Sequence, residues 1–211
     1  MRQRNVKNKK EIINKSKYII NEPSNNVGNW KLVFNNDNPI YIEIGMGKGD
    51  FILENAKKYP DINFIGIEKY DSIMALAIKK IEENDLDNLR LIRMDALDID
   101  SVFRKEIDKI FLNFSDPWPK ERHAKRRLTS SVFLEKYDKL FKNEKIIEMK
   151  TDNRRLFEFS LISFNNNDYF IDDISLDLHN SDYDNNIMTE YEKKFSSMNN
   201  CIYYVKVKKN K

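Results

Sequence analysis

An acidic residue stands close to a glycine-rich turn, at the end of the first strongly apolar segment of the chain. Glu43 precedes Gly45 by two residues, and Gly45 and Gly47 belong to the turn GMGKG at 45–49. Glycines let the backbone turn tightly and let a ligand approach the main chain. A carboxylate here would repel a pyrophosphate bound at a helix N-terminus. The turn therefore favours a ligand with a positive group, such as an amino group beside a sulfonium.

Two further acids end the next two apolar segments. Glu68 can accept hydrogen bonds from both hydroxyls of a ribose, as acids do at this place in nucleotide-binding sheets. Asp95, followed by Ala96, can reach the exocyclic amine of an adenine. Each acid alone is more often an ordinary surface residue, but three acids at three successive segment ends weaken that interpretation. A nucleoside with a positive charge fits best, and we expect the cofactor S-adenosylmethionine.

The segment NFSDPWPK at 113–120 combines an acid with a tryptophan between two prolines. The prolines stiffen the loop that follows Asp116 and fix its direction. Trp118 offers a flat face on which a nucleobase could stack, a contact worth roughly 1–3 kcal/mol. The alternative is a rigid loop with a partly buried tryptophan and no ligand, which the position at the ligand edge of the sheet disfavours.

Positive charge is unevenly distributed, although the net charge of the 211 residues is only +3. One basic cluster fills residues 1–17 and includes Arg2 and Arg4, and another lies at 206–211. An internal cluster adjoins the tryptophan loop and consists of Lys120, Arg122, Lys125, Arg126 and Arg127. Segregated basic residues attract phosphate backbones. A solvated tail is an equally good interpretation of the two termini, whereas the internal cluster indicates a partner with phosphate groups.

The composition also argues against several classes of protein. No apolar run approaches the roughly 20 residues that span a bilayer, and the charged N-terminus lacks the apolar stretch of a signal peptide. Cys201 is the single cysteine, which suits a reducing compartment. His123, His179 and Cys201 are too few for a structural zinc site. We therefore expect a cytoplasmic protein with no membrane segment and no metal.

Apolar runs typical of strands alternate with stretches typical of helices from Pro39 onward, and these elements must position the acids. The strand-like runs are 40–44, 62–67, 89–94, 109–114 and 145–149, and the predicted helices are 50–58, 72–83, 129–141 and 153–164. Continuous apolar strands separated by helices indicate a parallel sheet covered on both faces. Ligands of such open sheets bind beyond the carboxyl ends of the strands, where the acids lie.

The two ends of the chain differ from this pattern. Residues 169–174 and 201–207 are strand-like and a long polar loop separates them, so we expect a final strand pair with one antiparallel member. Residues 1–35 look like a basic helical N-terminal extension, and residues 36–211 form a single domain. The predicted fold class is α/β, with a doubly wound, mostly parallel, seven-stranded sheet.

The motif NFSDPWPK, followed by RHAKRRL at 122–128, closely resembles the bacterial tRNA (guanine-N7-)-methyltransferase family, whose members are similar to compact class I methyltransferases. The resemblance extends over nearly the whole chain and includes EIGMGKGDF at 43–51, DINFIGIE at 61–68, TDN at 151–153 and MTEYEKKF at 188–195. It implies methyl transfer from S-adenosylmethionine to N7 of a guanosine in the tRNA variable loop, conventionally position 46. The implied partner is tRNA, no protein partner is required, and a homodimer remains open.

The resemblance also implies roles for individual residues. The four acids implied to bind the methyl donor are Glu43, Glu68, Asp95 and Asp116. The turn residues Gly45 and Gly47 and the strand-end residue Ala96 belong to the same predicted site. The implied guanosine-binding residues are Lys120, Asp152, Thr189, Glu190, Tyr191 and Glu192. The stretch from Arg122 to Arg127 is implied to touch RNA. Lys69, which follows Glu68, has no role that the sequence explains.

The chemistry of guanine N7 limits what the protein must do. This nitrogen loses no proton on methylation, so the main task is placement of its lone pair in line with the methyl group. Positive charge moves from sulfur to the base, and a nearby carboxylate would favour that shift. We expect Asp116 and Asp152 to be the catalytic carboxylates, with Glu192 as a third candidate.

Three other functions fit the sequence less well. Methyltransferases that act on an exocyclic adenine nitrogen resemble one another in an Asp/Asn-Pro-Pro-aromatic motif after the fourth strand. The corresponding segment of this chain, NFSDPW at 113–118, differs from that motif. Glu43 and the glycine spacing oppose an NAD-dependent oxidoreductase. A catalytically silent RNA-binding protein would not need the strand-end acids, and titration with S-adenosylmethionine separates it from an enzyme.

Overall fold

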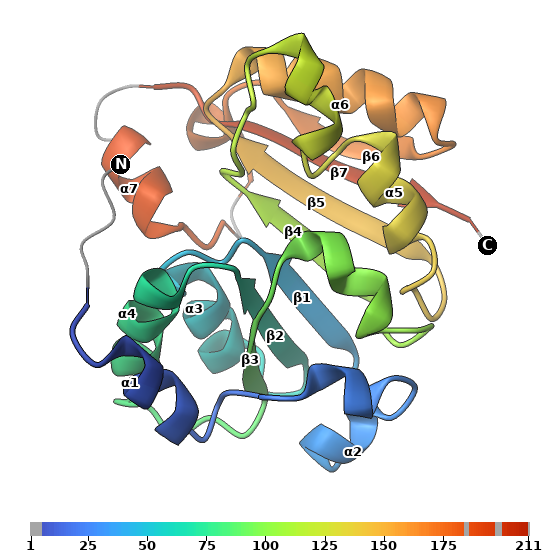
Figure 1. The fold of residues 1–211 in the computed structure, drawn as a ribbon. Coiled ribbons are helices and arrows are strands. Elements are labelled where there is room, and N and C mark those ends of the chain that lie inside the picture. Colours follow the sequence, from blue (N-terminus) through green and yellow to red (C-terminus); the bar gives the residue numbers. More distant parts are fainter. Residues whose placement is uncertain (1–5, 184–185, 197–199, 211) are drawn as a thin grey trace.

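A single seven-stranded sheet runs through the computed structural model, which describes residues 6–183, 186–196 and 200–210 (Figure 1). The strand order is β3-β2-β1-β4-β5-β7-β6. The strands are β1 Ile40–Ile44, β2 Asn63–Glu68, β3 Leu89–Arg93, β4 Lys109–Asn113, β5 Lys145–Thr151, β6 Phe170–Ser175 and β7 Tyr203–Lys209. The first five pair in parallel, and β7 is antiparallel to both β5 and β6. The predicted doubly wound, mostly parallel sheet and its final strand pair are confirmed.

Helices cover both faces of the sheet, as the apolar strands require (Figure 1). On one face lie α1 (Lys9–Lys15), α3 (Asp50–Lys58) and α4 (Asp71–Ile81); on the other lie α2 (Trp30–Phe34), α5 (Ser131–Tyr137) and α6 (Arg154–Asn166). In α4 the side chains of Met74, Ala77, Ile78 and Ile81 are buried, a spacing of three and four residues that places them on one side of a helix. Every residue of β2 is buried, because helices cover it from both sides.

The order of the strands sets the place of a ligand. β2 and β4 flank β1 on opposite sides, so the direction in which the chain adds strands reverses at β1. Loops on the two sides of such a switch point diverge and leave a crevice at the carboxyl ends of the strands. The loops after β1, β2, β3 and β4 all reach this edge, and they carry the acids that the sequence singled out.

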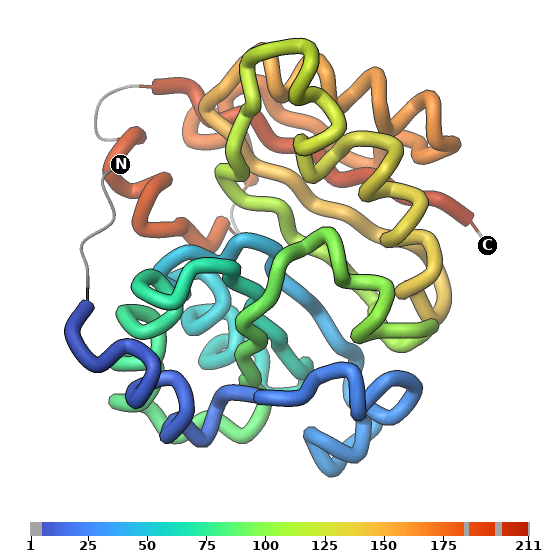
Figure 2. The backbone as a smooth tube through the Cα atoms, viewed as in Figure 1, coloured from blue at the N-terminus to red at the C-terminus, as the bar shows by residue number. Residues whose placement is uncertain are grey.

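Residues of the N-terminal part pack against the sheet. Tyr18 and Trp30 are almost fully buried, and the Trp30 indole N–H donates a hydrogen bond to the Val102 carbonyl at 2.9 Å. Ile19 forms a β-bridge with Leu91 of the edge strand β3. Figure 2 shows this segment running along one end of the molecule. Arg2 and Arg4 of the basic N-terminal cluster, as well as Lys211 at the other end, lie outside the described residues.

The structure differs from the sequence prediction in the polar stretch before the last strand. The segment predicted to be a long loop contains the short 3-10 helix η4 (Leu178–Asn180) and the helix α7 (Glu190–Ser196). A helix of seven residues is marginal by itself, and α7 depends on contacts with the sheet that are described below. The helix predicted at 129–141 is shorter and ends at Tyr137, after which Phe141 bridges Ile107. No helix within the described residues is long and apolar enough to cross a membrane.

Candidate active site

A cavity of about 770 Å³ opens at the carboxyl ends of β1 to β4. Its volume lies within the roughly 300–1,000 Å³ of sites that hold small molecules. The predicted site residues that line it are Gly45, Glu68, Asp95, Ala96, Asp116, Lys125 and Arg126, together with Trp118. The cavity thus brings together residues at the ends of four strands and two members of the basic cluster, Lys125 and Arg126.

The glycine-rich turn after β1 leaves room for a ligand. Gly45, Gly47 and Gly49 have φ of 79°, 59° and 77°, in the left-handed region that favours glycine. A Cβ added at Gly45 or Gly47 would meet no atom of the described residues within 4 Å, whereas one at Gly49 would press on the Cβ of Ala77 at 3.3 Å. The first two glycines therefore leave open space beside the backbone, and the third lets α3 pack against α4.

Glu68 is held in place by backbone donors at the end of β2. Its carboxylate accepts hydrogen bonds from the N–H of Tyr70 at 2.9 Å and from the N–H of Gly47 at 3.2 Å. Burial raises the pKa of Glu68, which the backbone hydrogen bonds oppose. Each carboxylate oxygen takes one of these bonds and keeps capacity for another, so the group can accept from two hydroxyls in the cavity.

Asp95 at the end of β3 has a cationic neighbour. Lys69 donates to Asp95 at 2.5 Å, and the N–H of Leu97 donates to the other carboxylate oxygen at 3.0 Å. Burial works in the opposite direction, but the bonds from Lys69 and Leu97 hold the pKa of Asp95 below its usual range. Lys69, which had no assigned role in the sequence analysis, thus stabilises the ionised form of Asp95 at the cavity wall.

Glu43 does not line the cavity. Its side chain is 1% exposed, and one carboxylate oxygen accepts a hydrogen bond from the Asn113 amide at 2.9 Å. The other oxygen, Oε2, meets no hydrogen-bond partner among the described residues. Burial raises the pKa of Glu43 to about 8, although Asn113 and Lys150 act against it. A buried carboxyl oxygen without a partner is rare, and its isolation from water favours the protonated form of the group.

The tryptophan loop after β4 has an unusual backbone that a buried arginine supports. Phe114 and Trp118 have φ of 50° and 41°, which bulky residues seldom adopt. The Arg127 guanidinium donates to the carbonyl oxygens of Pro117 and Trp118, both at 3.1 Å. Arg127 is 6% exposed, so this member of the predicted RNA-binding set points inward. Arg126 stacks on Trp118 with 4.9 Å from its guanidinium carbon to the ring centroid.

The remaining basic residues of the cluster face solvent. Lys120 precedes the 3-10 helix η3 (Glu121–Arg126), which carries the others, and Lys120, Arg122, Lys125 and Arg126 are all exposed. They lie directly beside the cavity, since Lys125 and Arg126 line it. A phosphate group could reach each of them without any rearrangement of the core.

The predicted guanosine-binding residues meet on the far side of the tryptophan loop. Asp152 follows β5, and the Tyr191 hydroxyl donates to it at 3.4 Å. The Tyr191 ring lies 5.0 Å from that of Phe114, which lines the cavity. Glu190 forms an ion pair with Lys48 of the glycine-rich turn at 2.6 Å. Helix α7 therefore connects the turn after β1 with the ends of β4 and β5.

Glu192 is placed differently from its neighbours on α7. It is fully buried, and the Lys150 ammonium donates to it at 2.6 Å. Burial lowers the pKa of Lys150, and Glu192 opposes this shift. Sequence reasoning missed Lys150, and the only signal was a lysine directly after the fifth strand-like run, 145–149. The described residues contain no group of three or more His, Cys, Asp or Glu side chains that could hold a metal ion.

The strand order, with acids at the ends of β2 and β3 around one cavity, defines a class I methyltransferase. Solved structures agree on the fold. A structure described as an antibiotic related methyltransferase has a TM-score of 0.64 at 18% identity and covers 87% of this chain and 94% of its own. A 16S rRNA (adenine(1408)-N(1))-methyltransferase from Catenulisporales acidiphilia, with its cosubstrate SAM, has a TM-score of 0.60 at 10% identity and covers 87% and 91%.

Sequence relatives are much closer. A family described as "Putative methyltransferase" matches residues 37–205. The tRNA (guanine-N(7)-)-methyltransferase of Lachnoclostridium phytofermentans is 51% identical over 96% of this chain and 96% of its own length. The enzyme with the same name from Bacillus cytotoxicus is 52% identical over 92% and 89%. The chain belongs to the tRNA (guanine-N7)-methyltransferase family.

Proposed function

We propose that this protein transfers a methyl group from S-adenosylmethionine to N7 of a guanosine in the tRNA variable loop, conventionally position 46. One observation carries the proposal. Asp116 and Trp118 of the tryptophan loop line the same cavity as Glu68 and Asp95. A base stacked on Trp118 would therefore lie next to a nucleoside held by the two acids. The names of the relatives support tRNA as the substrate and guanine N7 as the target.

The residues around the cavity fit the methyl donor. Glu68 would accept from the ribose hydroxyls, and Asp95 with Ala96 would hold the adenine. Gly45 and Gly47 leave open space for the methionine part. The amino group would bind Asp116 on the cavity wall, because Glu43 is 1% exposed and does not line the cavity. When bound, the donor supplies a methyl group on a positively charged sulfur.

The role of the protein in the chemical step is placement and electrostatics. Because guanine N7 has a free lone pair and loses no proton, no side chain has to act as a base. Asp116 and Asp152 would stabilise the positive charge that develops on the base. Lys120, Thr189, Glu190 and Tyr191 would hold the guanosine from the opposite side, with Tyr191 supported by Asp152 and Phe114.

Binding of tRNA would use the exposed basic residues. Arg122, Lys125 and Arg126 would contact phosphates beside the cavity. A nucleotide engaged in tertiary pairing has to leave its stack to reach the site, at a cost of a few kcal/mol. Phosphate contacts and stacking on Trp118 would offset that cost. We place the protein in the cytoplasm, where its tRNA substrate is found.

The proposed function is tested by incubating the purified protein with unmodified tRNA and methyl-labelled S-adenosylmethionine, followed by cleavage specific for 7-methylguanosine. We expect one labelled site, in the variable loop. A transcript with adenosine in place of that guanosine serves as the control and should take up no label. Label on another base, or no transfer at all, would contradict the proposal.

A further inference from the structure

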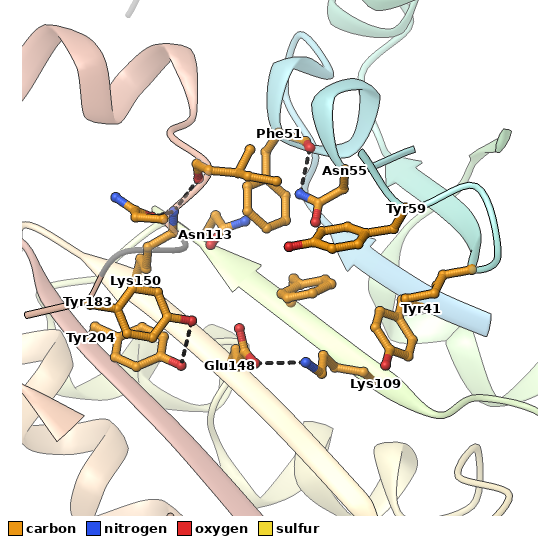
Figure 3. A pocket seen from close by; sticks show the side chains of 14 residues that line it. Tyr41, Phe51, Asn55, Tyr59, Lys109, Asn113, Glu148, Lys150, Tyr183 and Tyr204 are labelled. Carbon is orange, nitrogen blue, oxygen red and sulfur yellow. Dashed lines mark hydrogen bonds and ion pairs between the residues drawn. The ribbon is translucent and has the colours of Figure 1, made fainter. Parts of the chain in front are cut away.

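Lys150 and Glu192 form an ion pair that is almost completely shielded from water. Their side chains are 6% and 0% exposed, and Lys150 Nζ lies 2.6 Å from Glu192 Oε2. Lys150 belongs to β5 and Glu192 to α7, so the pair joins the sheet to a helix 42 residues further along the chain. Figure 3 shows Lys150 rising from β5 beside Asn113, at one end of a second cavity of about 260 Å³.

Both partners are fully engaged with the segment that leads into α7. Lys150 also donates to the Asn186 side-chain oxygen at 3.0 Å and to the Ile187 carbonyl at 2.8 Å. Glu192 accepts from the Asn186 amide at 2.5 Å and lies 3.2 Å from His179 Nε2. The Thr189 hydroxyl accepts from the N–H of Glu192 at 2.9 Å, which caps the helix start. The pair therefore fixes the start of α7 as well as its buried side.

The opposite side of α7 carries the residues that face the proposed active site. Glu190 reaches Lys48 on the glycine-rich turn, and Tyr191 reaches Asp152 and Phe114. These outward contacts are weak by themselves, because Lys48 and Glu190 are 40% and 53% exposed and exposed pairs contribute little. A helix of seven residues also has little stability of its own. Among the ion pairs of α7 in the described part of the chain, the pair of Lys150 with Glu192 is the one most shielded from water.

We propose that Lys150 and Glu192 form a buried latch that positions α7 across the cavity, and that Glu192 is a positioning residue which does not touch the guanosine. The proposal deepens the proposed function and rests on it for the meaning of the site. Tyr191 and Glu190 are then the residues of α7 that contact the substrate. Lys150 affects the substrate only indirectly, because it fixes the position of these two residues.

The latch makes a specific prediction for a double-mutant cycle. Removing one partner of a buried ion pair leaves an uncompensated charge and is strongly destabilising, whereas removing both is far less so. We expect Lys150→Met and Glu192→Met each to lower kcat for tRNA methylation by about tenfold or more, because the substrate-binding residues of α7 are misplaced. The double variant should be no worse than the worse single variant, because the two residues act through one element.

Hydrogen–deuterium exchange of the protein alone supplies a readout that needs no activity. In both single variants the amides of residues 190–196 should lose protection by about tenfold or more, while those of β1 and β4 stay protected. The protected β1 and β4 amides show that the variant is folded. Lys57→Met is the matched control, because it removes a lysine from an exposed pair with Glu54 and should change neither readout.

Two outcomes would overturn the latch. One is an unchanged protection of 190–196 in Lys150→Met. The other is a further tenfold loss of kcat when Glu192→Met is added to Lys150→Met, which would show that Glu192 acts on the substrate itself. Were the wild-type protein to methylate no tRNA, the proposed function would fail, and the exchange experiment would still decide whether the latch exists. If a single variant fails to fold, the exchange pattern of residues 190–196 in the double variant decides whether the latch exists.

Discussion

The guanidinium of Arg127 donates a hydrogen bond to the carbonyl oxygen of Trp118 at 3.1 Å, from a side chain that is buried beneath the tryptophan loop. It also lies 4.3 Å from the ring centroid of Phe159 on α6. Arg127 thereby ties the loop that carries Asp116 to the helix layer on one face of the sheet. The left-handed backbone at Trp118 needs such support, because a bulky residue with this φ carries a conformational cost.

Replacement of Arg127 should therefore affect the fold of the loop more than the attraction for RNA. Lysine cannot reproduce the two parallel hydrogen bonds of a guanidinium, and loss of a buried charged hydrogen bond costs about 1.5–3 kcal/mol. We expect Arg127→Lys and Arg127→Gln each to lower the free energy of unfolding by about this amount and to lower kcat. The salt dependence of tRNA binding should stay unchanged in Arg127→Gln, which removes the charge. Denaturant unfolding and binding titrations at several salt concentrations measure the two effects, and a changed salt slope would contradict the inward role.

The exposed neighbours of Arg127 should behave in the opposite way. Arg126 and Lys125 line the rim of the cavity and face solvent. Each phosphate contact that is lost should reduce the slope of log K against log salt by roughly 0.7–0.9. We expect Lys125→Ala to show this reduction while the free energy of unfolding stays constant. Lys142→Ala, an exposed lysine away from the cavity, is the control, and equal slopes in all three proteins would exclude a phosphate contact at Lys125.

Much of the sheet could be predicted from the sequence, because its strands are continuous apolar runs between clear helix signals. Residues 40–44 and 50–58 were predicted with the bounds that the structure has. The loops that bring Glu68, Asp95 and Asp116 to one cavity follow from the same pattern, since parallel strands end at one edge. The prediction was good wherever local sequence and tertiary burial favour the same structure.

The features that sequence reasoning missed depend on contacts between distant residues. Helix α7 is short and carries only Tyr191 and Phe195 as large aromatic residues, and the buried pair of Lys150 with Glu192 joins it to the sheet. The composition of the basic cluster does not reveal which of its side chains is buried. Arg127 is the buried one because its guanidinium donates to the Pro117 and Trp118 carbonyl oxygens, whose positions depend on the fold of the loop. The burial of Glu43 depends in the same way on Asn113 from the neighbouring strand β4.

The raised pKa of Glu43 predicts a specific dependence of stability on pH. Its pKa is about 8 in the folded protein against a usual value of 4.5. Between these two values the folded state keeps a proton that the unfolded chain has released, so stability should fall as pH rises through this window, by at most roughly 1.4 kcal/mol per pH unit. Glutamine cannot ionise and can still accept from Asn113, so Glu43→Gln should show a flatter pH profile than the wild type.

The measurement is denaturant unfolding of both proteins between about pH 5 and pH 8, the window that the shift defines. The difference between the two profiles isolates Glu43 from the other titrating groups. Glu54→Gln, at an exposed position paired with Lys57, should keep the wild-type profile. Parallel profiles for wild type and Glu43→Gln would show that Glu43 is ionised in the folded protein.

Asp116 offers the most direct test of catalysis by a carboxylate. It is exposed on the wall of the cavity and makes no contribution to the core, so Asp116→Ala should leave the free energy of unfolding within about 0.5 kcal/mol of the wild type. Loss of a group that stabilises charge in the transition state typically lowers turnover by about 10²–10³. Single-turnover methyl transfer at saturating donor and tRNA measures this step apart from binding. The matched control is Asp98→Ala, an exposed acid on the 3-10 helix η2 (Ala96–Ser101) that does not line the cavity. A rate for Asp116→Ala that stays near the rate of Asp98→Ala would remove Asp116 from the chemical step and leave Asp152 as the remaining predicted catalytic carboxylate.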